Sequence, residues 1–181
     1  GFIDNEIRYF QGDVLPVSHA ASYSTVARTE LVACADLRQD IMAAFGALHG
    51  IPPERQYTDY RAMIERERPD IVSITTQPEH RAEIAIFAAE NGVKALYCEK
   101  PLCASMEEAD RLTEAVERNG VRFTMGVNYR WDSGTVLVKE MLAADRVGAL
   151  QTILLYPGRG LFNMGSHALA VAQFLNDDVP A

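Results

Sequence analysis

Short apolar runs alternate with longer amphipathic stretches along the chain between residues 30 and 127. The short runs predict buried strands, and they lie at residues 30–36, 70–76, 94–98 and 121–127. The longer stretches predict helices, and they lie at residues 38–49, 59–67, 79–91 and 106–118. Strands that alternate with helices in this way indicate a parallel sheet with helices on both faces. The pattern therefore predicts an α/β fold with a doubly wound parallel sheet.

Turn and capping residues mark the ends of these predicted helices. Gly50 follows the first helix and Asn119-Gly120 follows the last, as expected where a helix stops. Ser105 and Glu108 fit a capping box, in which the serine side chain caps the helix and the glutamate reaches back to the preceding backbone. These signals support a helix that begins near residue 106.

The regular alternation of predicted strands and helices ends after Val127. Residues 134–144 and 166–176 predict helices, and residues 150–156 predict a fifth strand. A chain of 181 residues can bury one full α/β core but not two domains of ordinary size. We therefore predict one complete domain at residues 1–127 and the truncated start of a second α/β domain at residues 128–181.

Charge and hydropathy narrow the possible partners. The chain has 25 acidic and 17 basic residues, a formal net charge of −8, and no basic stripe of the kind that binds nucleic acid. No window approaches the roughly 18 to 20 apolar residues of a membrane helix, and residues 1–30 do not resemble a signal peptide. We expect a cytoplasmic protein with neither a nucleic-acid nor a membrane partner.

The cysteines and most histidines show no metal-binding pattern. An odd number of cysteines without a CxxC pair favours reduced, packed thiols over disulfides or a metal site, at Cys34, Cys98 and Cys103. Zinc is not expected, because metal-ligand spacing is missing among His19, His49 and His80.

Polar residues follow four of the predicted strands. Ligands of an open parallel sheet bind beyond the carboxyl ends of its strands, so these residues are the first candidates for a site. They are Asp36, Thr75-Thr76-Gln77-Pro78, Glu99-Lys100-Pro101 and Asn128-Tyr129-Arg130. Structural loops are also polar, so their clustering alone is compatible with a purely structural role.

Asp36 stands where a dinucleotide fold places an acid. Such an acid accepts hydrogen bonds from the adenosine ribose and repels a 2′-phosphate, which favours NAD over NADP. Arg38 nearby could offset this preference, and Asp36 could also simply cap the helix that follows. The glycine-rich phosphate loop expected about 20 residues earlier is not recognisable, and only Gly12 is available there.

Lys100 and His167 are the candidate acid–base residues. A lysine held near a nicotinamide ring can exchange a proton with a substrate hydroxyl, and Glu99 is a possible partner for its charge. His167 lies four residues after Asn163, which is also a natural N-cap for the last helix. The alternatives are a surface lysine at a strand end and a structural histidine.

Four segments together resemble a known family. They are residues 70–80 (DIVSITTQPEH), residues 99–101 (EKP), residues 126–130 (GVNYR) and residues 163–167 (NMGSH). They are similar to the glucose–fructose oxidoreductase / inositol dehydrogenase (Gfo/Idh/MocA) family, and the likeness runs from about His19 to Leu175.

The resemblance implies a Rossmann domain followed by an α/β domain that drives homo-oligomerisation, and hydride transfer between NAD (or NADP) and a sugar or cyclitol carbon. Lys100 and His167 would then be catalytic. The residues around the cofactor would include Gly12, Asp36, Arg38, Thr75, Gln77, His80, Glu99, Lys100, Pro101 and Asn128. The substrate would meet Lys100, Tyr129, Arg130, Asn163 and His167.

Two departures from the family keep other functions open. The phosphate-binding glycines are missing, and Asn163 stands where the family often has Asp, so a proton relay through this position is weakened. The alternatives to a dehydrogenase are a non-catalytic sensor or partner protein that binds a nucleotide or sugar, and a glycosidase that works through transient oxidation.

Overall fold

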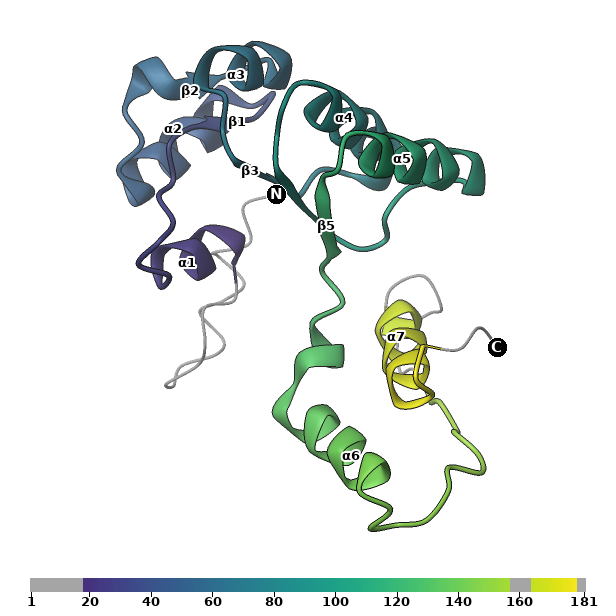
Figure 1. The fold of residues 1–181 in the computed structure, drawn as a ribbon. Helices are drawn as coiled ribbons and strands as arrows, with labels where there is room; N and C mark the ends of the chain where they lie inside the picture. The colour runs from purple at the N-terminus through teal and green to yellow at the C-terminus, as the bar shows by residue number, and fades with distance from the viewer. Residues whose placement is uncertain (1–17, 157–163, 179–181) are drawn as a thin grey trace.

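The computed structural model describes residues 18–156 and 164–178. Its strands are β1 (Cys34–Ala35), β2 (Gln56–Tyr57), β3 (Ile71–Ile74), β4 (Ala95–Cys98) and β5 (Arg122–Met125). Its α-helices are α1 (His19–Ser24), α2 (Gln39–His49), α3 (Tyr60–Glu67), α4 (Pro78–Glu90), α5 (Met106–Arg118), α6 (Ser133–Ala143) and α7 (Ser166–Leu175). Two short 3₁₀ helices, η2 (Pro53–Arg55) and η3 (Asn128–Trp131), complete the set (Figure 1).

All strand pairs are parallel, as the alternation of strands and helices predicts. β3, β4 and β5 form one sheet in this order, and the register places Ser73 beside Tyr97 and Ile74 beside Cys98. β1 and β2 form a separate pair. The predicted α/β class with a parallel sheet is confirmed.

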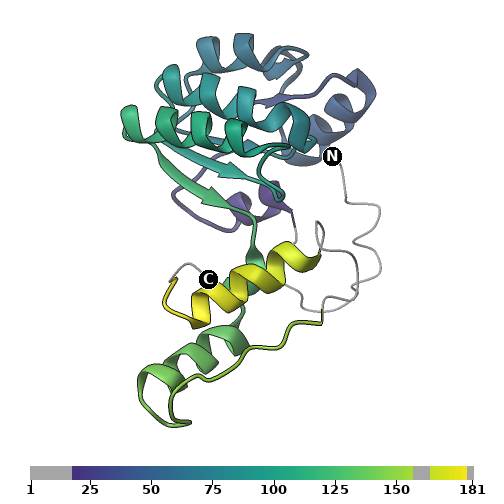
Figure 2. The same cartoon turned by 90° about the vertical axis from the view of Figure 1, so that its right-hand side faces the viewer.

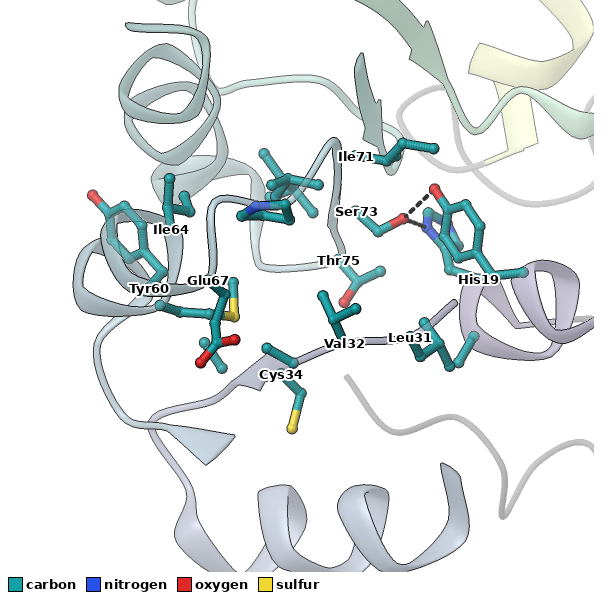
Figure 3. A pocket seen from close by; sticks show the side chains of 18 of the residues that line it. His19, Leu31, Val32, Cys34, Tyr60, Ile64, Glu67, Ile71, Ser73 and Thr75 are labelled. Atoms are coloured by element: carbon teal, nitrogen blue, oxygen red, sulfur yellow. Dashed lines mark hydrogen bonds between the residues drawn. The ribbon is translucent and has the colours of Figure 1, made fainter. Parts of the chain in front are cut away.

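The sheet is divided between β1 and β3. In the usual strand order of a doubly wound dinucleotide fold, one more strand lies between the strands that correspond to β1 and β3. The described residues contribute no strand at this position. A cavity of about 660 Å³ lies in this place and is lined by residues 31–34 and by β3 (Figure 3). Within residues 18–156 and 164–178, the two parts of the sheet share no strand pairing.

Alternating side chains of β3 and β4 give the sheet two different faces. Val72, Ile74, Leu96 and Cys98 are buried on the face that α4 and α5 cover (Figure 2), whereas their neighbours point to the opposite face, where α1 lies. Small residues allow α4 to approach closely, because its buried positions include Ala82, Ala85, Ala88 and Ala89. The core of the described residues thus lies on the side of the sheet that α4 and α5 cover.

Most predicted boundaries agree with the structure to within a few residues. The helix predicted at residues 106–118 is α5 without change, and Glu108 N–H donates to the Ser105 hydroxyl at 3.2 Å as a capping box requires. The Glu108 carboxylate reaches one residue further back than expected, to the N–H of Ala104 at 2.8 Å. The strand predicted at residues 30–36 is reduced to β1, whose only partner is the equally short β2.

The strand prediction for residues 150–156 is wrong. This segment has no regular structure, and Leu154 and Tyr156 are 72% and 88% exposed. An apolar run becomes a strand only where a neighbouring strand pairs with its backbone, and the described part of the chain offers none. The sequence pattern also did not predict α1, β2 or the 3₁₀ helices.

The segment after β5 packs as a small helical unit apart from the sheet (Figures 1 and 2). The Trp131 ring of η3 lies 5.8 Å from the Phe174 ring of α7, and the Lys139 ammonium of α6 donates to the backbone carbonyl of Leu175 at 3.4 Å. Within residues 18–156 and 164–178, every helix is too short or too polar to cross a membrane. The domain boundary after Val127 stays a prediction.

Leu96 offers a direct test of the core. This side chain is 1% exposed on the central strand, so Leu96→Ala is expected to lower the free energy of unfolding by about 2–5 kcal/mol through lost burial and a residual cavity. Leu48→Ala is the matched control, since Leu48 is 60% exposed on α2 and should change stability by less than about 0.5 kcal/mol. Urea unfolding of both variants measures the difference, and equal losses would contradict the core assignment.

Candidate functional site

The Glu99 carboxylate is the centre of a hydrogen-bond network at the carboxyl end of β4. Its Oε1 lies 3.2 Å from His19 Nε2, and its Oε2 accepts from the backbone N–H of Lys100 at 3.0 Å. Burial acts to raise the pKa of Glu99, but these two hydrogen bonds and the nearby charges outweigh burial and hold the pKa below its ordinary value. Glu99 is therefore an ionised carboxylate with a fixed orientation.

His19 comes from α1 and was not predicted as a site residue. Its ring stacks on Tyr97 with centroids 4.0 Å apart and an interplanar angle of 11°. Its Nδ1 lies 2.8 Å from the Ser73 hydroxyl, which is 3.1 Å from the Tyr23 hydroxyl (Figure 3). A neutral imidazole satisfies the whole network, since Tyr23 can donate to Ser73, Ser73 to His19 Nδ1, and His19 Nε2–H to Glu99.

The register of the sheet explains how one histidine reaches so many partners. Ser73 and Tyr97 are side-by-side on β3 and β4 and point to the same face. The backbone of α1 begins at Ser18, whose hydroxyl accepts from the N–H of Ala21 at 3.1 Å. This cap places His19 in the first turn of the helix, above the strand pair.

Arg81 is the second residue that the sequence analysis missed. It lies near the N-terminus of α4 and is 3% exposed. Its guanidinium donates to the carbonyl oxygens of Glu99 (2.6 Å), Pro101 and Thr76, so it joins the loop after β3 to the loop after β4. One signal in the sequence could have identified it: Arg81 is the first of the buried positions on the apolar face of α4, where a charged side chain is not expected.

His167 is buried at the N-terminal turn of α7. The residue is 8% exposed, and its Nδ1 has no hydrogen-bond partner among the described residues. Burial lowers the pKa of His167, the Lys100 charge lowers it further, and Glu99 partly opposes them. His167 is thus a neutral imidazole at pH 7, within electrostatic reach of Lys100, although the two residues are far apart in the sequence.

The predicted substrate residues Tyr129 and Arg130 and the predicted cofactor residue Asn128 occupy different environments. The Tyr129 ring lies 4.8 Å from the ring of His167, and Asn128 Oδ1 accepts from the Tyr97 hydroxyl at 3.2 Å. Arg130 instead forms a two-pronged ion pair with Asp178, and its guanidinium lies 4.9 Å from the centre of the Phe174 ring. Through these contacts, Arg130 connects η3 to α7 and to the residues that follow it.

The remaining predicted cofactor residues lie at the ends of β1 and β3. Asp36 is partly buried and lines the cavity, and its Oδ1 accepts from the N–H of Arg38 at 2.8 Å. The Arg38 side chain points to Asp40 (2.6 Å) in an exposed ion pair. Thr75 lines the cavity, whereas Gln77 and His80 are exposed around the start of α4.

Two predicted site residues, Gly12 and Asn163, lie outside the described residues. Asn163 was also expected to cap the last helix, but the N-cap position of α7 is Gly165.

The cavity between β1 and β3 has two chemically different parts. Apolar side chains from residues 31–34 and from β3 line its inner part, and Asp36, His19 and Thr75 stand among its polar lining residues. Its apolar part lies between the two strands, whereas the carboxylate of Asp36 and the polar Thr75 follow the strand ends, where a parallel sheet binds the ribose and amide groups of a dinucleotide. Within the described ranges, no three side chains of His, Cys, Asp or Glu are grouped to hold a metal ion.

The buried thiol at the end of β4 is not a nucleophile candidate. Cys98 is 0% exposed, and burial raises its pKa to about 12, so it remains protonated at neutral pH. Burial also raises the pKa values of Cys34 and Cys103, and all three cysteines are free thiols. The acid–base candidates are therefore Lys100 and His167.

Known proteins with similar sequences are sugar and cyclitol dehydrogenases. The chain is 29% identical over 180 residues to D-apiose dehydrogenase of Paraburkholderia graminis, which covers 90% of this chain and 47% of that protein. It is 32% identical over 126 residues to inositol 2-dehydrogenase of Salmonella typhimurium, which covers 69% of this chain and 37% of that protein. The chain thus spans about half the length of these relatives, or less.

Solved structures and a family model agree with these relatives. The fold is similar to that of a putative myo-inositol dehydrogenase from Sinorhizobium meliloti, with a TM-score of 0.76 and 23% identity over 90% of this chain and 52% of that one. Residues 13–127 match the model of an oxidoreductase family with an NAD-binding Rossmann fold. The resemblance seen in the sequence is therefore confirmed, and the chain belongs to the Gfo/Idh/MocA oxidoreductase family.

Proposed function

We propose that this protein is an NAD-dependent oxidoreductase that acts on a hydroxyl-bearing carbon of a sugar, sugar derivative or cyclitol. The observation that carries the proposal is the buried imidazole of His167 on α7, whose pKa is lowered by burial and by the charge of Lys100 in the loop after β4. The relatives named for apiose and inositol support a polyhydroxylated substrate. NADP stays possible as the cofactor.

Lys100 and His167 would divide the proton chemistry between them. A bound nicotinamide would accept the hydride from the substrate carbon. His167, being neutral, would take the hydroxyl proton, while the Lys100 ammonium would donate a hydrogen bond to the same oxygen and stabilise its developing negative charge. Positioned acid–base groups of this kind typically contribute about 10²–10⁴-fold to the rate.

The cofactor would extend from Asp36 to the loop after β4. Asp36 would accept a hydrogen bond from the adenosine ribose, and Thr75, Glu99 and Asn128 would surround the nicotinamide end. Arg38 forms only an exposed ion pair with Asp40, so the preference between the two cofactors depends on the charge of Asp36. This arrangement favours NAD.

Three further expectations belong to the same proposal. The substrate domain would begin after Val127, the protein would be cytoplasmic, and it would form a homo-oligomer through that second domain. The exposed apolar side chains of residues 150–156, such as Leu154 at 72%, support a further packing partner for this segment.

Lys100 provides the main test. Lys100→Met is expected to lower kcat for sugar-dependent NAD reduction by about 10²–10⁴-fold, because the substrate oxygen loses its charged donor. NADH binding, followed by fluorescence, should change little. Lys94→Met is the matched control, since Lys94 lies at the opposite end of β4 in an exposed ion pair with Asp70. Near-normal turnover of Lys100→Met would refute the assignment. Absence of NADH and NADPH binding by the unaltered protein would instead favour a non-catalytic function.

Asp36 tests the choice of cofactor. Asp36→Asn keeps an oxygen for the N–H of Arg38 but removes the charge, so NADH should bind roughly tenfold more weakly through loss of about 1.5 kcal/mol, and discrimination against NADPH should fall. Asp110→Asn makes the same charge change on an exposed residue of α5 and should leave both affinities unchanged. Fluorescence titration with the two cofactors gives the ratio, and an unaltered ratio in Asp36→Asn would contradict this role.

His167 predicts a pH dependence of stability. Its pKa is lower in the folded protein than the ordinary value of 6.5, so below pH 6.5 the unfolded chain binds more protons. The free energy of unfolding should therefore fall as the pH drops from 6.5 through the folded pKa, and His167→Asn should lose this part of the fall. His80→Asn, at an exposed site, should retain it. Urea unfolding across this range measures the slopes, and equal slopes in both variants would contradict the assignment.

A further inference from the structure

Arg81 is the most deeply buried charged side chain in the part of the chain that the structure describes. It is 3% exposed, and burial lowers the pKa of its guanidinium, although the group stays charged because its ordinary pKa is so high. No carboxylate lies within ion-pair distance of it in residues 18–156 and 164–178. A buried charge without a carboxylate partner is costly, so its position requires an explanation.

Backbone carbonyls take the place of a counter-ion. Nη1 donates to the carbonyls of Glu99 and Pro101, and Nη2 donates to the carbonyl of Thr76. Glu99 and Pro101 are the two neighbours of Lys100 in the chain, so the guanidinium is hydrogen-bonded to the backbone on both sides of this residue. Thr76 belongs to the loop that leads from β3 into α4.

Only a planar fork can make these contacts together. The guanidinium presents several N–H groups at fixed angles, whereas a lysine ammonium is a single point of donation on a flexible stem. The carboxylate of Glu99 is engaged elsewhere, with His19 and with the N–H of Lys100. Arg81 therefore acts on the backbone of residues 99–101, and the Glu99 side chain acts on a separate part of the network.

We propose that Arg81 is a positioning residue that fixes the backbone on both sides of Lys100 and thereby sets the position of the Lys100 ammonium in the site. The proposal rests on the function proposed above, because it is the pairing of Lys100 and His167 that gives the position of this loop its importance. Arg81 itself touches neither of these side chains in any hydrogen bond that involves the described residues, so its effect passes through the backbone.

The pKa of His167 is a readout that needs neither cofactor nor turnover. The groups whose charges act on this imidazole are Lys100, which lowers the pKa, and Glu99, which raises it. Lys100→Met should therefore raise the measured pKa of His167. Arg81→Met should raise it as well if the ammonium moves away when its loop is released. The pKa is followed by NMR titration of the imidazole C–H signals, with His167→Asn used to assign the resonance.

A double-mutant cycle separates positioning from a direct effect of the arginine charge. If Arg81 acts through Lys100, adding Arg81→Met to Lys100→Met produces no further rise in the pKa of His167. Arg81→Lys keeps a positive charge but not the fork, so it should also raise the pKa in the presence of Lys100. Arg61→Met is the matched control, because Arg61 bonds Glu83 of α4 at the surface and should leave the pKa unchanged.

Each outcome decides a different claim. If the pKa of His167 rises in the Lys100→Met variant but stays unchanged in folded Arg81→Met and Arg81→Lys variants, only the role of Arg81 is overturned. A full additional shift of Arg81→Met in the Lys100→Met background shows a direct charge effect and also overturns it. No shift in Lys100→Met overturns the pairing of Lys100 and His167, and the proposed function with it. Thermal unfolding is measured first, and Arg81→Lys carries the test if Arg81→Met does not fold.

Discussion

The site depends on one buried cation that is neutralised by backbone carbonyls. Arg81 fastens the loops that follow β3 and β4, and the positions of Glu99 and Lys100 follow from this attachment. Such an arrangement is stable only because the guanidinium meets several acceptors at once; with a carbonyl lost, the uncompensated charge would be costly. Three carbonyl acceptors from two loops restrict the geometry of residues 99–101, although the Arg81 Nε is buried without a hydrogen-bond partner among the described residues.

The same two strands build the core and the site on their opposite faces. Leu96 and Cys98 are buried under α4 and α5, while Tyr97 between them supports the ring of His19 on the other face. Since side chains alternate along a strand, a shift of β4 by one residue would expose the core and bury Tyr97. The packing of Leu96 therefore sets the register on which the site depends, and stability and function are linked through this strand.

The sequence predicted what depends on local pattern and missed what depends on distant neighbours. The limits of α5 could be read from its periodicity and its serine cap, and the family could be identified from short motifs that include Lys100 and His167. His19 gains its role only when α1 lies over β3 and β4, and Arg81 only when two loops bring their carbonyls to it. Leu154 illustrates the opposite error: an apolar run satisfies the pattern of a strand, but the part of the chain that the structure describes offers its backbone no strand to pair with.

The two ends of the proposed site, at Lys100 and at Asp36, are supported by different strands of the sheet. Lys100, Glu99 and His19 rest on β3, β4, α4 and α1, which are joined by strand pairing and by Arg81. Asp36 rests on β1, a pair of residues bonded only to β2 and packed between α2 and α3. The proposed acid–base end and the proposed ribose end of the site thus rest on different strand pairs of the described residues.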